Sequence, residues 1–227
     1  MGIVAKQSVW NSVILFTGAF LGALNTVILF PKMLEQSEIG LTGMLSNLAI
    51  IAAQVSAFGM PSVLVRYIPK YRNNKGENGG VLRFVLLLAI IGAVIVSLAL
   101  FFGRDIFLGW YSKGAEQFSK YYFLVIPLLI FTVLTTVLNN YYKSILRSIF
   151  QNFMQEIFIR ICKTAVLIVY FFDWISFDQF ILYFVLISGV SILILVIYLL
   201  IIGEFNLSKS ESSKSIKDRG EMIIYGL

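Results

Sequence analysis

Six stretches of about 20 apolar residues constrain this chain more than any other feature of its sequence. Each is long enough to cross the hydrocarbon core of a bilayer as an α-helix, and polar connections separate them. The stretches cover residues 9–30, 39–60, 81–102, 121–138, 153–172 and 180–202. Because backbone groups in lipid must be hydrogen-bonded within the protein, we expect an all-α polytopic membrane protein with six transmembrane helices.

Lysine and arginine are distributed unevenly between the two sides that six crossings would define. The chain has 18 of these residues, and only four fall on the side opposite the N-terminus: Lys32, Arg104, Lys113 and Lys120. Loops rich in lysine and arginine stay in the cytoplasm, so the sequence predicts a cytoplasmic N-terminus. This topology accounts for the net charge of +6, and there is no Lys/Arg-rich run typical of nucleic-acid binding.

Three charged residues lie inside the fifth stretch. The apolar run that follows them, 164–172, is only about 13 Å long as a helix, whereas a bilayer core is about 30 Å thick. The span must therefore begin near Phe153, which places Arg160 about 10 Å and Lys163 about 15 Å from that end. Glu156, Arg160 and Lys163 have the spacing i, i+4 and i+7, which predicts one shared face of the helix.

Charge at this depth is costly and usually faces a bundle interior or a water-filled cavity. Glu156 can neutralise only one of the two cations, so we expect Arg160 and Lys163 to contact an anionic substrate or a lumen. The alternative is structural: Glu156 and Arg160 form an ion pair within the helix, and Lys163 reaches back to the interface. The sequence leaves both open.

The first helix carries a stripe of small and polar residues. Asn11, Gly18, Gly22 and Asn25 follow one another at spacings of seven, four and three. Glycines four apart let a neighbouring backbone approach closely. The stripe therefore predicts a packing seam with amides bonded across helices, and the alternative is that Asn25 lines a substrate cavity.

Three more residues are candidates for substrate contact. Asn47 and Gln54 are seven apart on the second helix, a spacing that places two amides on one face. Arg66 follows that helix among aromatic and proline residues. It could meet a phosphate-bearing lipid at a cytoplasmic mouth, or it could act only as a topology determinant that touches anionic headgroups.

Nothing in the sequence indicates an enzyme, a cofactor or a metal site. There is no histidine, the single cysteine is Cys162, and no phosphate-binding glycine-rich loop or soluble catalytic segment is present. We expect a membrane lobe over residues 1–202, a polar cytoplasmic linker over 203–222, and the start of a seventh helix at 223–227. The chain would then be part of a longer transporter.

Several short motifs resemble the N-terminal half of one transporter family. They are LEQSEIG at 34–40, GMPS at 59–62, RYIPKY at 66–71 and YKSILRS at 142–148. In these the chain resembles the polysaccharide and oligosaccharide lipid flippases of the multidrug/oligosaccharidyl-lipid/polysaccharide exporter superfamily. The first helix has no arginine or aspartate, unlike that of lipid II flippases and many drug exporters, which favours the oligosaccharide branch.

The resemblance implies two six-helix lobes around a central cationic cavity that opens alternately to either side. Such a protein carries an undecaprenyl-pyrophosphate-linked oligosaccharide across the bacterial inner membrane during surface polysaccharide synthesis. Its partners would be that substrate, the membrane lipids and the C-terminal lobe of the same transporter. A cation-coupled multidrug exporter of the same fold and a non-transport membrane assembly subunit are the alternatives.

Overall fold

The protein folds entirely into helices over the residues that the structure describes, and no strand occurs among them. The structure is a computed structural model that describes residues 3–71, 77–109, 115–204 and 221–222. In chain order the elements are α1 (Ile3–Ala23), η1 (Leu24–Leu29), α2 (Phe30–Met33), α3 (Gln36–Ala57), α4 (Met60–Tyr71), α5 (Glu77–Phe102), α6 (Arg104–Gly109), α7 (Ala115–Tyr121), η2 (Tyr122–Leu124), α8 (Val125–Ser144), α9 (Ser148–Phe153), η3 (Met154–Phe158), α10 (Ile159–Phe171) and α11 (Phe177–Ile201).

Five helices are long and apolar enough to cross a membrane. They are Gln7–Met33, Gln36–Ala57, Gly80–Phe102, Gln117–Ser144 and Phe177–Ile201. They coincide with the first, second, third, fourth and sixth predicted spans, so an all-helical, multi-pass membrane protein is confirmed. The predicted fifth span lies in another long helix, formed by α9, η3 and α10, which carries Glu156, Arg160 and Lys163. The predicted linker and seventh helix fall mostly outside the described residues.

The first two helices end differently from what their prolines suggest. Pro31 does not stop the first helix, which continues to Met33. The second helix ends earlier than predicted, at Ala57, where Phe58 and Gly59 both adopt positive φ. A separate helix, α4, then begins at Met60.

Helix α4 is amphipathic and was not predicted as an element of its own. Val63, Leu64, Tyr67 and Ile68 are buried, with the helical spacing i, i+1, i+4 and i+5, whereas Arg66 is exposed. The buried face packs on α5 and α8. An apolar face opposite exposed cations is typical of a helix at a membrane interface.

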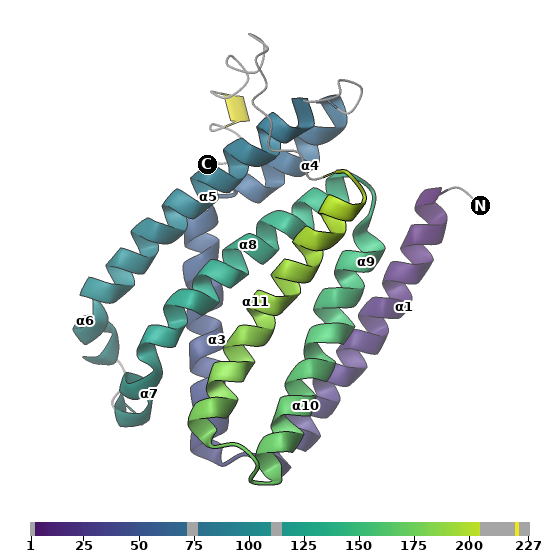
Figure 1. The fold of residues 1–227 in the computed structure, drawn as a ribbon. Helices are drawn as coiled ribbons and strands as arrows, with labels where there is room; N and C mark the ends of the chain where they lie inside the picture. The colour runs from purple at the N-terminus through teal and green to yellow at the C-terminus, as the bar shows by residue number, and fades with distance from the viewer. Residues whose placement is uncertain (1–2, 72–76, 110–114, 205–220, 223–227) are drawn as a thin grey trace.

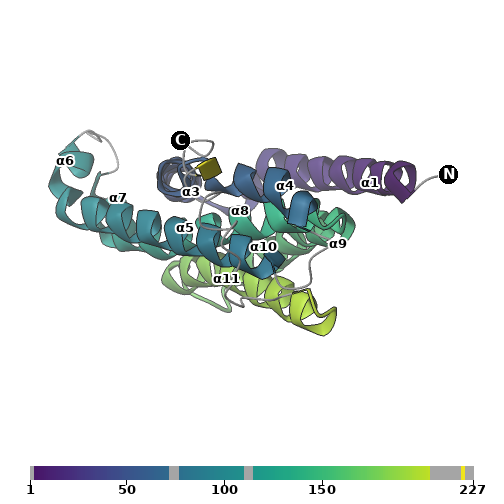
Figure 2. The ribbon, with the colours of Figure 1, turned by 90° about the horizontal axis from the view of Figure 1, so that it is seen from above.

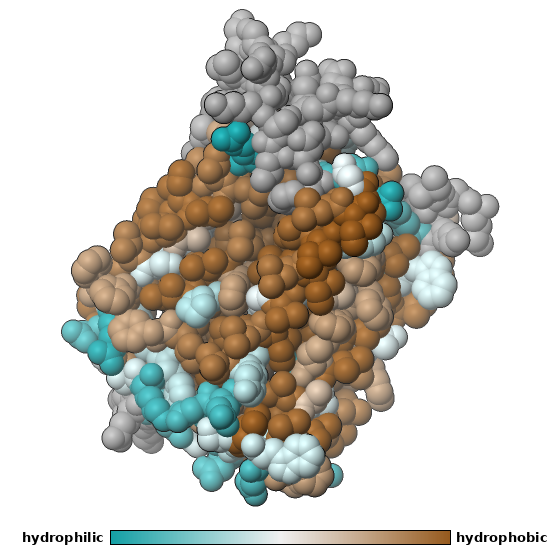
Figure 3. All heavy atoms as spheres, viewed as in Figure 1, coloured by the Kyte–Doolittle hydropathy of each residue, from teal (hydrophilic) through white to brown (hydrophobic). Residues whose placement is uncertain are grey.

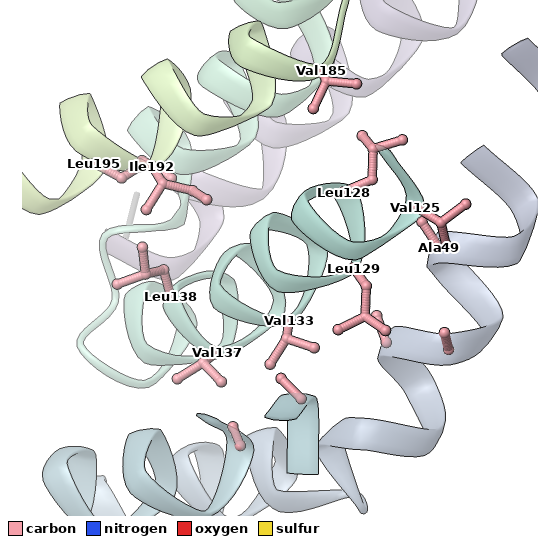
Figure 4. Close-up of a cluster of buried hydrophobic side chains, with 14 of the residues drawn as sticks. Ala49, Val125, Leu128, Leu129, Val133, Val137, Leu138, Val185, Ile192 and Leu195 are labelled. Carbon is pink, nitrogen blue, oxygen red and sulfur yellow. The ribbon is translucent and has the colours of Figure 1, made fainter. Parts of the chain in front are cut away.

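Helix α8 is the centre of the bundle. It packs against α3, α4 and α5 on one side and against α11 on the other (Figure 1). The close-up in Figure 4 shows Val125 and Leu129 pointing toward α3, and Leu128 and Leu138 lying on the side of α11. All four side chains are buried. We call α3, α4, α5 and α8 the central group.

Helix α1 lies outside the central group and packs along α9, η3 and α10. Seen from above, α1, α3 and α4 occupy one side of the molecule and α11 the opposite side (Figure 2). Large apolar side chains on α1 are exposed, Phe16 at 78% among them. A broad apolar band with polar residues toward its two ends is also visible on the face with α5, α8 and α11 (Figure 3). Such a surface suits contact with lipid.

Candidate functional site

The long helix formed by α9, η3 and α10, which we call the charged helix, meets α1 along a seam of small residues. A methyl group added at Gly18 would lie 2.6 Å from Glu156 Cβ and 3.0 Å from the Glu156 carbonyl oxygen. One added at Gly22 would collide with the guanidinium of Arg160. The two glycines therefore create the space that Glu156 and Arg160 occupy, as their spacing predicts.

Arg160 is held by two partners within this seam. Its Nη2 lies 2.6 Å from Glu156 Oε2, one helical turn earlier. Its Nη1 donates to the carbonyl oxygen of Gly18 on α1. The side chain of Arg160 remains 31% exposed and that of Glu156 28% exposed, so the pair lines an accessible surface rather than a closed core. A guanidinium has five N–H donors, which leaves capacity for a further anion.

Both helices widen where they meet. Two π-helical turns, η1 and η3, lie in the paired stretches, and η3 contains Glu156. The Phe30 N–H donates to the Asn25 carbonyl, and the Ile159 N–H donates to the Met154 carbonyl. Pro31 explains the first turn, because proline has no N–H and its ring would clash with a carbonyl one turn earlier. No proline accompanies the second turn; π turns are frequent at functional sites.

Amides and hydroxyls continue the seam in both directions. The Thr164 hydroxyl lies 2.8 Å from Asn25 Oδ1 and 2.7 Å from the Arg160 carbonyl oxygen, and its one proton serves either acceptor. Toward the other end, Asn11 donates to the Ser148 hydroxyl at 2.8 Å and accepts from Asn152 at 3.1 Å. We call this strip the polar seam; its core is Gly18, Gly22, Asn25, Glu156, Arg160 and Thr164.

Lys163 points to a different neighbour. Its Nζ lies 3.7 Å from the centre of the Phe184 ring on α11, a cation–π contact. Among the described residues no carboxylate pairs with it. Residues 160 and 163 are about 60° apart around a helix. The two long side chains therefore leave nearly the same face of the charged helix, and Arg160 reaches α1 while Lys163 reaches α11. The charged helix thus presents one compensated and one uncompensated cation.

The remaining predicted residues lie away from the polar seam. Asn47 and Gln54 are exposed on α3, on the face that does not pack on α8, together with the exposed Ile51. Arg66 is exposed on α4, with its guanidinium 5.9 Å from the centre of the Tyr67 ring. Of the sequence-predicted residues, the structure therefore joins Asn25, Glu156 and Arg160 in one site.

A buried carboxylate links the charged helix to the central group. Glu38 is 7% exposed, and its Oε1 accepts a hydrogen bond of 2.7 Å from the hydroxyl of Tyr170 on α10. Its Oε2 accepts from the backbone N–H of Glu35 at 3.0 Å, which completes a capping box at the start of α3. The spacing of Glu35 and Glu38 signals the cap, but no pattern in the sequence signals its tyrosine partner.

Three buried polar atoms, near the C-terminal end of α8 and in the first part of the charged helix, lack a hydrogen-bond partner among the described residues. They are Asn139 Oδ1 on α8, Gln151 Oε1 on α9 and Gln155 Nε2 on η3. Gln151 is 3% exposed. Groups of this kind are usually satisfied by ordered water, so the interior beside the charged helix has a polar lining that sequence reasoning missed.

Comparisons with known proteins assign no family to this geometry: no family model, curated protein or solved structure matches the chain.

Proposed function

We propose that this chain is a six-crossing lobe of a flippase that moves a lipid-linked, pyrophosphate-bearing oligosaccharide across the bacterial inner membrane. The observation that carries the proposal is the set of three ionisable side chains on one membrane-length helix, none of which is fully buried. In this reading the helix from Ser148 to Phe171 is the fifth of six crossings, and the N-terminus is cytoplasmic. The motif resemblance suggests the substrate class, and the intramembrane cations supply a chemical reason why an anionic headgroup would bind there.

The cost of the charges supports a functional role. An arginine or lysine at the centre of a transmembrane helix costs about 2.5 to 3.5 kcal/mol on insertion-based scales. A hydrophobic residue would pack at Lys163 without that cost, and Glu156 does not compensate it. A pyrophosphate cannot cross hydrocarbon without fixed countercharge, which a partly exposed Arg160 and Lys163 would provide.

The Glu156–Arg160 pair suggests how the site would respond to substrate. Without a bound anion, the Glu156 carboxylate pairs with the Arg160 guanidinium and reduces the net positive charge of the site. A diphosphate competes for the same donors, and Lys163 supplies a second cation near it. Rocking of this lobe against a partner lobe would then change the side to which the bound headgroup is open.

Neutralising both cations in the full transporter tests the proposal. We expect Arg160→Gln with Lys163→Gln to reduce surface-polysaccharide export at least tenfold at unchanged protein level, because the headgroup loses its countercharge. Export is measured by complementing a flippase-null strain. Arg83→Gln, near the start of α5, is the control and should retain most export. Normal export by the double variant would refute the proposal.

A structural role for the pair is the second candidate, and one observation favours it. Arg160 already has two partners, Glu156 and the Gly18 carbonyl, so it could serve only to hold α1 in place. Loss of the protein from the membrane in the double variant, instead of loss of export, would establish this role.

The six-crossing topology has its own test. In a Cys162→Ala background, Ser176→Cys between α10 and α11 should react with an impermeant maleimide added outside the cell. Ser62→Cys on α4 should react only after the membrane is opened. Both residues are exposed, so access decides the result. Labelling of both from the same side would contradict the proposed topology.

A further inference from the structure

A cavity of about 910 Å³ lies beside the polar seam, near the N-terminal end of α1. It is a partly open groove, bordered by α1, the turn between α8 and α9, α9 itself, η3 and the C-terminal part of α11. The volume is within the range of about 300 to 1,000 Å³ for small-molecule sites. None of the residues assigned above to the substrate lines it.

The cavity has one polar end and a long apolar wall. Gln7 and Arg147 lie at the polar end, and the wall of α1 continues through Trp10, Ile14 and Thr17. From residue 7 to residue 17 the helix rises about 15 Å, which is half of a bilayer core of about 30 Å. A cavity one leaflet deep with a cation at its mouth has the shape of a site for an amphiphile.

Local geometry holds the polar end in a defined shape. Leu146 has a φ of 58°, a left-handed conformation that is unfavourable for leucine. The Gln7 side chain donates to its carbonyl oxygen, and the Arg147 N–H donates to the Tyr142 carbonyl at 2.9 Å. These bonds fix the turn from which Arg147 projects. The bond from the Arg147 N–H to the Tyr142 carbonyl is that of a helix C-cap, so the end of α8 sets the position of Arg147.

The opposite wall is aromatic and rigid. The rings of Phe150 and Tyr198 stack with their centres 4.1 Å apart, and both line the cavity. Tyr198 also stacks on Tyr142, whose hydroxyl donates to the Leu195 carbonyl at 2.7 Å. The wall is therefore braced by buried groups. Among the described residues that line the cavity, none is acidic.

We propose that this cavity binds one acyl chain of an anionic phospholipid, with the lipid phosphate at Arg147. A basic pocket between transmembrane helices at one interface is the arrangement that recognises anionic headgroups. The apolar wall accounts for the chain, and the absence of acidic lining residues accounts for the preference for negative charge. The proposal depends on the membrane assignment of the helices and not on the flippase substrate.

Trp10 makes the cavity measurable by fluorescence. The full chain carrying Trp110→Phe and Trp174→Phe retains Trp10 alone, and it is reconstituted in phosphatidylcholine vesicles. Part of the lipid is replaced by phosphatidylglycerol or phosphatidylcholine brominated on the acyl chain, which quenches tryptophan on contact. We expect brominated phosphatidylglycerol to be enriched at Trp10 roughly fivefold over brominated phosphatidylcholine, as one cation near a surface allows. Arg147→Gln should abolish this preference.

Lys143→Gln is the matched control. Lys143 is exposed one turn earlier on α8 and does not line the cavity, so its loss should leave most of the preference intact. Equal quenching by the two brominated lipids would overturn the proposal, since Trp10 would then meet only boundary lipid. Quenching by neither lipid would overturn it in favour of a protein occupant, such as a second copy. Displacement of brominated phosphatidylglycerol by trace polyprenyl phosphate would overturn the choice of a phospholipid. The chain that retains Trp10 alone, with Arg147 intact, decides these outcomes even if Arg147→Gln or Lys143→Gln does not fold.

Discussion

The central group and the polar seam solve helix association in two different ways. Around α8, buried aliphatic side chains interdigitate, and Leu129 and Val133 are almost completely inaccessible. Between α1 and the charged helix, glycines bring backbones together and polar groups bond across the contact. Lipid chains are as apolar as leucine, so burial of apolar area cannot drive helices together in a membrane. Dense packing of aliphatic side chains holds the central group together, whereas close backbone approach and hydrogen bonds hold the polar seam together.

The difference also separates stability from accessibility. The core side chains that pack around α8, such as Leu129 and Val133, are closed off, whereas Glu156 and Arg160 remain about one third exposed. A region held by few polar contacts can open at lower free energy than a densely packed core. We therefore expect α1 to separate from the bundle before the central group unfolds. The polar seam is the better place for a site that must change partners.

Leu129→Ala in the central group should have the largest effect on stability. Leu129 is fully buried on α8, so its removal leaves a cavity among α3, α5 and α8. Such a change costs about 2 to 5 kcal/mol in soluble proteins. We expect the lower end here, because the transfer contribution largely disappears in lipid. Thermal unfolding in detergent measures the loss.

Leu193→Ala is the control for this cavity. Leu193 is 62% exposed on α11, and the substitution should shift the melting temperature little. If the two alanine variants were equally stable, α8 would not be the packed centre of the bundle.

Gly18→Ala should break the polar seam at a smaller cost. The new methyl group would overlap Glu156 Cβ and crowd its backbone, which cannot move aside as a flexible side-chain end can. Overpacking of this kind costs about 1 to 3 kcal/mol. Protease accessibility of α1 should rise, while the unfolding of the central group stays nearly unchanged.

Gly43→Ala on α3 makes the same chemical change in open space, since a Cβ there meets nothing within 4 Å. It should stabilise the helix by up to about 1 kcal/mol through helix propensity. A Gly18→Ala protein that kept α1 protected would show that the close approach of the two helices is not required.

Thr164→Val should have the smallest effect. It keeps the shape of the side chain but removes the hydroxyl that meets Asn25 across the seam. Hydrogen bonds between transmembrane helices contribute about 0.6 kcal/mol on average. A double-mutant cycle with Asn25→Ala measures the coupling between the two side chains. A coupling energy near zero would indicate that glycine packing alone holds α1.

Local patterns in the sequence were sufficient for most of the helices. The apolar stretches predicted all five helices that are long and apolar enough to span a membrane. Glycine spacing also predicted the close contact of α1. The ends of the first two helices, which were predicted at the wrong residues, also have local causes. A π turn before Pro31 lets the first helix continue past that proline, and the positive φ of Phe58 and Gly59 separates α4 from α3. Neither event changes the apolar count on which the spans were predicted.

The sequence by itself determined that the chain is helical, where its apolar segments run, and that charge lies within one of them. These properties depend on composition and on spacing along one helix, which the chain carries locally. Only the tertiary structure decided which neighbour each charge meets: Arg160 bonds to Glu156 and Gly18, and Lys163 lies over Phe184. It also brought Tyr170 to Glu38 and formed the cavity behind Trp10. Apart from the Glu156–Arg160 pair, whose spacing the sequence shows, these contacts join residues far apart in the chain, and their partners depend on how whole helices pack.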